Sequence, residues 1–231
     1  MKTVLIHGQS HEGSTCQIGR ILARKLGGEV TEFFLPRDFG EFCVGCTACF
    51  TKTETKCPHY RKLKPITDAI DEADVMIFAS PVYVYHVTGA MKTLLDHYGY
   101  RWMVHRPEER MFSKQAVVIS TAAGAGTRST NRDMADSLFF WGCGKIYKLG
   151  FGIAATSWTR VKPKVRAKIE RKTTALANKI RKQNGRAKPG LKTKGFFAIM
   201  RILQKGGLSE ADRSYWEEKG WLGRKRPWKG N

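Results

Sequence analysis

The chain has 231 residues, 42% of them hydrophobic, which suits one α/β domain with an appendage better than two full domains. The apolar run Val4 to Ile6 near the start is too short for a secretory signal or a membrane span, and no apolar stretch of 18 residues occurs, so we expect a soluble, cytoplasmic protein. The net charge of +21 is uneven: residues 1–155 carry 19 Lys+Arg and 15 Asp+Glu, whereas residues 156–231 carry 22 and 5. The basicity therefore belongs to the C-terminal third.

Short apolar runs alternate along the chain with segments of helical periodicity. The runs predict strands at 2–7, 30–35, 75–79, 116–121 and 146–153. Helical patterns follow them at about 14–26, 63–72, 89–98, 131–141 and 163–180. This order predicts an α/β three-layer sandwich around a five-stranded parallel sheet of order 2-1-3-4-5. In such sheets ligands bind at the carboxyl ends of the strands, which here means the loops after strands one, three and four.

The loop after the first strand, Gly8 to Thr15, has features of a phosphate site. Ser10, Ser14 and Thr15 offer hydroxyl groups, and the helix that begins near Ser14 adds free backbone N–H groups. The loop lacks the lysine of a Walker A motif and is not G-x-G-x-x-G, so ATP and a bound dinucleotide are disfavoured. A phosphate monoester remains, and an ordinary helix start capped by Ser14 is the alternative.

The other two loops suit a flat ring. Ser80-Pro81-Val82-Tyr83 is a stiff turn that can present backbone N–H groups to a ring, with Tyr83 packed beside it. The stretch Thr121 to Gly126 has small residues that let a planar ligand approach the backbone. Each loop alone is compatible with an ordinary turn, but three at one sheet edge predict a ligand site.

The pattern G-x-S-x-x-G-S-T from Gly8, the segment ADVMIFASPVYVYHVTGAMKTLLDH from Ala73, and the glycine-rich loop resemble the NAD(P)H-dependent FMN reductase and iron–sulfur flavoprotein family. The resemblance covers about residues 1–155 and implies a flavodoxin-like fold, FMN, and a homodimer or homotetramer in which a neighbouring chain helps to cover the flavin. It implies that 100–112 is the covering loop. The flavin performs the chemistry, so no catalytic side chain is required. The implied FMN-binding residues are Ser10, Gly13, Ser14, Thr15, Pro81, Val82, Tyr83, Val84, Thr121, Ala122, Gly124 and Gly126.

Four of the six cysteines fall within fifteen residues, as Cys43-x2-Cys46-x2-Cys49-x7-Cys57. Disulfides are rare in the cytoplasm, and two consecutive x2 spacings are typical of [4Fe–4S] ligation, as in iron–sulfur flavoproteins. Free thiols, a zinc site and a disulfide are the alternatives. The segment 59–64 is basic where many relatives are acidic.

We expect residues 1–185 to form the FMN-binding domain, with the cysteine-rich loop at 43–57, and residues 186–231 a basic, Trp-rich helical extension. An apolar helix is predicted at 195–203, and Ser209-x-x-Asp212 resembles a capping box before Trp216 and Trp221. Those aromatic residues need a surface to bury against, on the core domain, a second protomer or an acidic partner. Nucleic acid and a membrane surface are disfavoured, because charge runs are usually solvated and no recognition motif occurs.

The sequence therefore predicts an FMN-dependent oxidoreductase. It would pass electrons from NAD(P)H, a transient substrate, or from a reduced ferredoxin to an acceptor, with a [4Fe–4S] cluster as a further carrier. The alternative is an electron-carrier flavoprotein that docks an acidic redox partner through its basic tail. A third option is a flavodoxin-like domain without cofactor that acts through nucleic acid.

Overall fold

Five parallel strands form one sheet in the order β2-β1-β3-β4-β5, as predicted. The computed structural model describes residues 1–207 and 209–229. The register places His7 opposite Phe34 and Ala79, and Pro81 opposite Thr121, so the carboxyl ends of β1, β3 and β4 lie at one edge. The strands are β1 (Lys2–His7), β2 (Glu29–Phe34), β3 (Val75–Pro81), β4 (Gln115–Ala122) and β5 (Lys145–Gly152).

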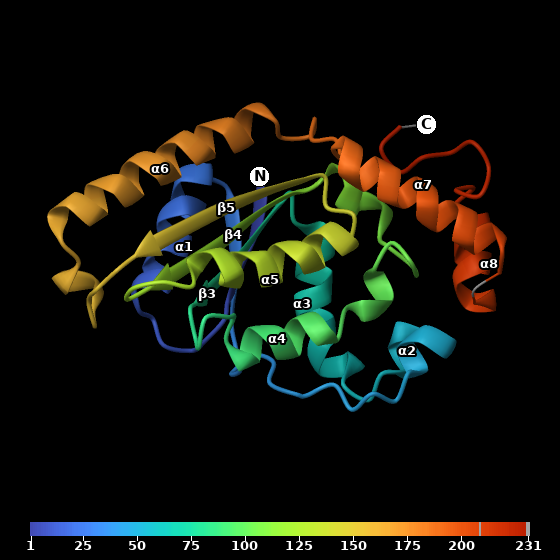
Figure 1. Cartoon of the computed structure of the whole chain (residues 1–231), viewed down its shortest axis with the longest axis horizontal. Helices are drawn as coiled ribbons and strands as arrows, with labels where there is room; N and C mark the ends of the chain where they lie inside the picture. The colour runs from blue at the N-terminus through green and yellow to red at the C-terminus, as the bar shows by residue number, and fades with distance from the viewer. Residues whose placement is uncertain (208, 230–231) are drawn as a thin grey trace.

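Helices cover both faces of the sheet (Figure 1). Side chains alternate between the faces along each strand, so Val4 and Ile6 pack on one side and Leu5 on the other. The first face carries α3 (Tyr60–Glu72), α4 (Gly89–Asp96) and α5 (Thr127–Phe140); the second carries α1 (Ser14–Leu26) and α6 (Pro163–Lys182). Two hydrophobic cores thus enclose the sheet, and the three-layer prediction is confirmed.

The helix starts and ends follow local signals. Gly27, with a φ of 74°, follows α1 directly, so that the helix ends at Leu26 as the predicted range 14–26 requires. Pro163 stands in the first turn of α6, where a missing N–H has no cost. The short elements were not predicted: α2 (Ala48–Thr51) and the 3-10 turns Glu54–Lys56, Gly99–Arg101, Glu109–Ser113 and Trp158–Arg160.

The C-terminal extension packs on the chain's own core domain. It forms α7 (Leu191–Lys205) and α8 (Glu210–Glu218), at the end of the molecule away from the carboxyl edge (Figure 1). A third core joins Phe197, Trp216 and Trp221 to Met103 and Phe112. The segment 100–112, expected to cover a neighbour's flavin, therefore lies against this chain's own extension.

No helix among the described residues combines the length and apolar character needed to cross a bilayer.

Candidate functional site

The loops after β1 and β3 are joined by a buried threonine. The Thr88 hydroxyl donates to the carbonyl of Gly8, and the Thr88 N–H donates to Ser80 Oγ at 3.1 Å. Thr88 also caps α4 by accepting from the Met91 N–H at 3.1 Å. The sequence did not single out Thr88, because the residues that it joins lie up to 80 positions away in the chain.

The loops after β1 and β4 meet at a second pair of hydroxyls. Thr15, in the first turn of α1, and Thr121, at the end of β4, hydrogen bond at 2.5 Å between their Oγ1 atoms, and both residues are buried. Two predicted site residues 106 positions apart are thus brought into contact. All three predicted loops belong to one connected edge.

The start of α1 has unpaired amide groups. Gly13 is its N-cap and offers no side chain, and the first intrahelical bond runs from Gln17 to Gly13. Among residues 1–207 and 209–229, no acceptor pairs with the N–H groups of Ser14, Thr15 and Cys16. A phosphate fits such a helix start. Of the predicted hydroxyls, Ser10 instead donates to the Leu35 carbonyl at 3.3 Å.

The loop after β3 is a tight hairpin. Tyr83 and His86 exchange two backbone hydrogen bonds of 3.0 Å each, and Val84 and Tyr85 between them have φ values of +47° and +67°. Positive φ at a β-branched residue is a strained conformation that clusters at functional sites. The tip is solvent-facing, with Val84 91% exposed.

This hairpin corrects part of the sequence interpretation. The Val82 N–H donates to the Thr121 carbonyl at 2.9 Å and the Tyr83 N–H donates to His86, so neither is available to a ring. In the described part of the chain, the N–H groups of Val84 and Tyr85 have no acceptor. Tyr83 itself is half exposed, and its hydroxyl donates to Gln9 in the first loop at 2.5 Å.

The loop after β4 lies beside the hairpin. Gly126 has a φ of +97°, and a Cβ there would stand 2.6 Å from Val82 Cγ1 and 3.2 Å from Tyr85 Cα. Only glycine fits this close approach. Gly124, by contrast, has open space where a Cβ would be. The space beside Gly124 is compatible with the predicted approach of a planar ligand to this loop.

A charged network below the first loop was missed by sequence reasoning. Arg20 of α1 donates to Glu12 in the loop at 2.5 Å and to Glu32 of β2 at 2.9 Å, and Glu32 accepts from His7 at 2.9 Å. Burial lowers the pKa of His7 below its usual value despite the nearby Glu32 carboxylate. Arg20 thereby ties the loop to the sheet.

The cysteine motif forms a second site. Cys43, Cys46, Cys49 and Cys57 line one pocket of about 60 Å³, with His59 and His97 also in its wall. Burial raises the pKa of the Cys49 thiol, and its three cysteine neighbours raise it further. The four predicted metal-binding cysteines therefore line one pocket.

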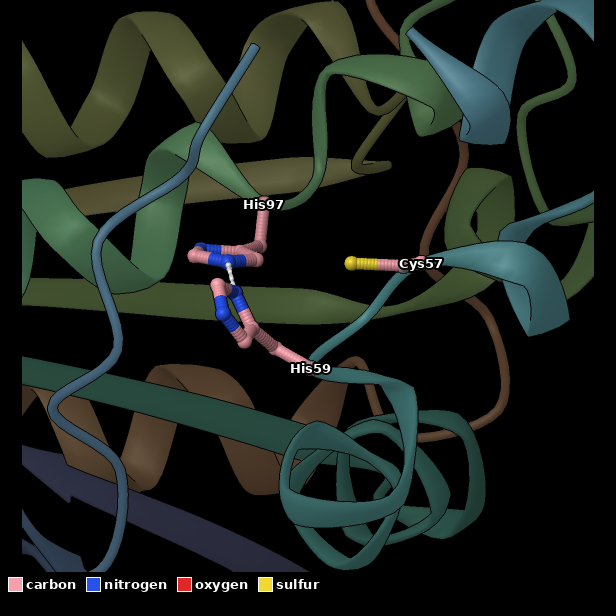
Figure 2. Close-up of side chains that lie close together, drawn as sticks. All are labelled: Cys57, His59 and His97. Carbon is pink, nitrogen blue, oxygen red and sulfur yellow. Dashed lines mark hydrogen bonds between the residues drawn. The ribbon is translucent and has the colours of Figure 1, made fainter. Parts of the chain in front are cut away.

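Two histidines bring a second donor set to this pocket, as Figure 2 shows. Ligand atoms of Cys57, His59 and His97 lie within 4.8 Å of one another. His97 Nδ1 donates to the Thr93 carbonyl at 2.8 Å, which leaves its Nε2 to accept from His59 Nδ1 at 3.0 Å. The four-thiolate set suits an iron–sulfur cluster, and the thiolate with two imidazoles suits zinc. Cys57 belongs to both sets.

The other two cysteines are buried and apart from the motif. Burial raises the pKa of Cys16 to about 11 and that of Cys143 to about 12, so both remain thiols at neutral pH.

The chain is similar in sequence to known iron-sulfur flavoproteins. The chain is 27% identical over 205 residues to an iron-sulfur flavoprotein of Archaeoglobus fulgidus, covering 85% of this chain and 86% of that protein. It is 36% identical over 73 residues to an iron-sulfur flavoprotein of Methanocaldococcus jannaschii, covering 32% of this chain and 36% of that one.

Solved structures share the fold. A flavone reductase superposes with a TM-score of 0.59 at 18% identity, covering 82% of this chain and 66% of its own. An NAD(P)H:quinone oxidoreductase from Methanothermobacter marburgensis gives 0.58 at 14% identity, covering 78% and 96%. Residues 1–155 match the family described as NADPH-dependent FMN reductase. The chain belongs to that family and is an FMN-dependent oxidoreductase of flavodoxin-like fold.

Proposed function

We propose that this chain binds FMN at the carboxyl edge of β1, β3 and β4 and passes electrons from NAD(P)H, or from a reduced ferredoxin, to an acceptor. The observation that carries this proposal is the joined edge: an uncapped start of α1, a strained hairpin and an open glycine loop, linked by Thr88 and by the Thr15–Thr121 pair. This edge offers free N–H donors suited to the FMN phosphate and open backbone suited to the flavin ring.

The protein's part is to bind and orient. Bound FMN supplies hydride acceptance and the passage of electrons one or two at a time. The N–H groups of Ser14, Thr15 and Cys16 would donate to its phosphate. The N–H groups of Val84 and Tyr85 would donate at the edge of the ring, and Gly124 leaves room for its face.

We further propose that Cys43, Cys46, Cys49 and Cys57 hold a [4Fe–4S] cluster. Their shared pocket supports this, as do the names of the relatives in Archaeoglobus and Methanocaldococcus. Helix α4 joins the two sites: it is capped at its start by Thr88, which is bonded to Gly8, and is followed by His97 in the cysteine pocket. Its eight residues span about 12 Å, at 1.5 Å per residue. Electrons would have a short route within one chain.

The exposed hairpin tip also supports a homodimer or homotetramer. Val84 and Tyr85 are 91% and 63% exposed although both have large apolar side chains. A second copy of the chain would cover them together with the flavin.

The test of the proposed function is to purify the protein without oxygen and record its visible spectrum before and after adding NADPH, NADH or reduced ferredoxin. We expect a flavin spectrum that bleaches with at least one donor, and iron and sulfide at four per chain. A colourless protein that takes up no added FMN and oxidises no donor contradicts the proposal. Zinc in place of iron would contradict the cluster alone.

The charge of α6 supports a second candidate, docking of an acidic redox partner. Lys164, Lys168 and Arg171 are exposed on α6 within a C-terminal third of strongly basic composition. Replacing all three by glutamine should slow reduction by ferredoxin, and raised salt should slow it in the wild type. Unchanged kinetics in the triple variant exclude this role.

A further inference from the structure

Residues 104–107 form a strap between the C-terminal extension and the cysteine loop. Side chains of the extension donate hydrogen bonds to backbone carbonyls of the strap. The Trp216 ring N–H donates to the His105 carbonyl at 2.6 Å, and the Tyr215 hydroxyl donates to the Pro107 carbonyl at 2.7 Å. The Gln204 side-chain amide likewise donates to the Val104 carbonyl. The extension thus donates to the backbone carbonyls of three of the four strap residues.

A buried carboxylate from the extension reaches two side chains of this strap. Asp212 of α8 is 2% exposed; its Oδ1 accepts from Arg106 Nη1 at 2.5 Å, and its Oδ2 accepts from His105 Nδ1 at 2.7 Å. The sequence suggested Asp212 as a capping-box residue. Its N–H does donate to Ser209, but its carboxylate points instead to the strap.

Arg106 continues from this carboxylate to the cysteine loop. Its Nη1 donates to the carbonyl of Phe50 at 3.2 Å, and its Nη2 donates to the carbonyl of Cys49. The Phe50 ring packs against the His105 ring with centroids 4.7 Å apart. The Arg106 side chain is 10% exposed, so its guanidinium depends largely on protein groups for its partners.

We propose that Asp212 is a positioning residue for the cysteine site, acting through Arg106 on the backbone that carries Cys49. This inference rests on the proposed function for the identity of what the pocket holds, but not for the contact itself. Cys49 and Phe50 are partly buried against the first hydrophobic core, but the rest of the cysteine loop has little support: Cys43 and Cys46 are exposed, and none of the residues of α2 is fully buried. The extension thereby supports the cysteine loop from outside the residues that line its pocket.

The physical reason lies in the buried charge pair. A neutral group at position 212 leaves the Arg106 guanidinium buried without its counter-charge, and a buried charge that loses its partner moves toward water. That movement takes both donors away from the Cys49 and Phe50 carbonyls. Cys49 is then free to leave the pocket.

The test compares Asp212→Asn, which keeps the size of the side chain, with Glu217→Gln as a matched control. Glu217 lies on the same helix, is half exposed and pairs with Arg213 at 3.0 Å, so its change alters the charge equally without touching the strap. Arg106→Lys is a second variant that keeps the charge but loses the fork of donors. Circular dichroism would confirm that each variant is folded.

Two readouts are measured. In metal-free, reduced protein, we expect Cys49 to react with a maleimide about tenfold faster in Asp212→Asn and Arg106→Lys than in wild type or Glu217→Gln, because the buried pair no longer holds the loop closed. In reconstituted protein, iron per chain should fall in the same two variants while FMN per chain stays unchanged.

Wild-type reactivity of Cys49 and wild-type iron content in folded Asp212→Asn would overturn the inference. Its failure is distinguishable from failure of the proposed function. If the wild type binds neither iron nor FMN but Asp212→Asn still exposes Cys49, the positioning contact stands and the proposed function falls.

Discussion

The hydroxyl groups of Thr15 and Thr121 lie 2.5 Å apart and join the start of α1 to the end of β4. One residue belongs to the loop proposed to bind the phosphate and the other to the loop proposed to face the ring. Because both are buried, the pair has no water to replace a lost partner.

Replacing Thr121 by valine should weaken FMN binding about tenfold, since a buried hydroxyl left unpaired costs about 1–3 kcal/mol and loosens the two loops. A fluorescence titration of FMN into the apoprotein measures this. Thr3→Val is the control, because Thr3 is also buried but its hydroxyl has no partner in the described chain. Equal affinity in Thr121→Val and Thr3→Val would contradict the role of the pair.

Replacing Gly126 by alanine should also weaken FMN binding and lower the melting temperature. A Cβ there would stand 2.6 Å from Val82 Cγ1 on a backbone with a φ of +97°, so the hairpin after β3 must shift. Thermal unfolding and FMN titration check both effects. Gly190→Ala, where a Cβ meets no atom within 4 Å, should change neither the melting temperature nor the FMN affinity. If Gly126→Ala matches this control in both quantities, the close contact of Gly126 with the hairpin does not matter for the site.

Much of the sheet and of the proposed site was predictable from local pattern. Apolar runs such as Val75 to Ala79 are recognisable because a parallel strand is buried on both faces. The glycines at 13, 124 and 126 and the proline at 81 marked the loops, because such residues determine backbone shape locally. The carboxyl edge followed from strand order alone.

What could not be predicted depends on contacts between residues far apart in sequence. Nothing near Thr88 indicates that its hydroxyl reaches Gly8, and nothing near Asp212 indicates Arg106, which lies 106 positions away. The use of the Val82 and Tyr83 N–H groups was misjudged for the same reason, because the hairpin partner His86 and the neighbouring strand occupy them. Burial of the tail against Met103 and Phe112 likewise needed the structure.

Lys114 supplies a prediction about stability. Its buried ammonium donates to the carbonyls of Ile70, Asp71 and Ala73 at 2.9, 2.7 and 2.5 Å, at the end of α3. Lys114→Met should reduce the free energy of unfolding by about 2–4 kcal/mol, because these carbonyls lose their donor. Urea denaturation measures it. Lys64→Met, on the exposed face of α3, should cost much less, because water screens the pair that Lys64 forms with Asp68. Equal losses in the two variants would contradict the stabilising role of the Lys114 ammonium.

His7 supplies a prediction about pH. In the unfolded chain the pKa of His7 is about 6.5, and burial lowers it in the folded state. At a pH between the folded and the unfolded pKa, the unfolded chain therefore binds a proton that the folded chain does not. The stability that depends on neutral His7 is therefore fully present above about pH 6.5 and decreases as the pH falls from there toward the folded-state pKa. Comparing the free energy of unfolding at about pH 7.5 and 5.5, we expect a smaller loss in His7→Gln than in wild type. The exposed His11→Gln should behave as wild type; an unaltered loss in His7→Gln excludes burial as the cause.

The most direct test of the FMN site is to titrate the apoprotein with FMN and, in parallel, with riboflavin, which lacks the phosphate. If the uncapped N–H groups of Ser14, Thr15 and Cys16 hold that phosphate, FMN binds at one per chain and at least about 100-fold more tightly than riboflavin, as expected when at least two of the three form charge-assisted hydrogen bonds. Equal affinity for the two flavins, or no binding of either, would contradict the account.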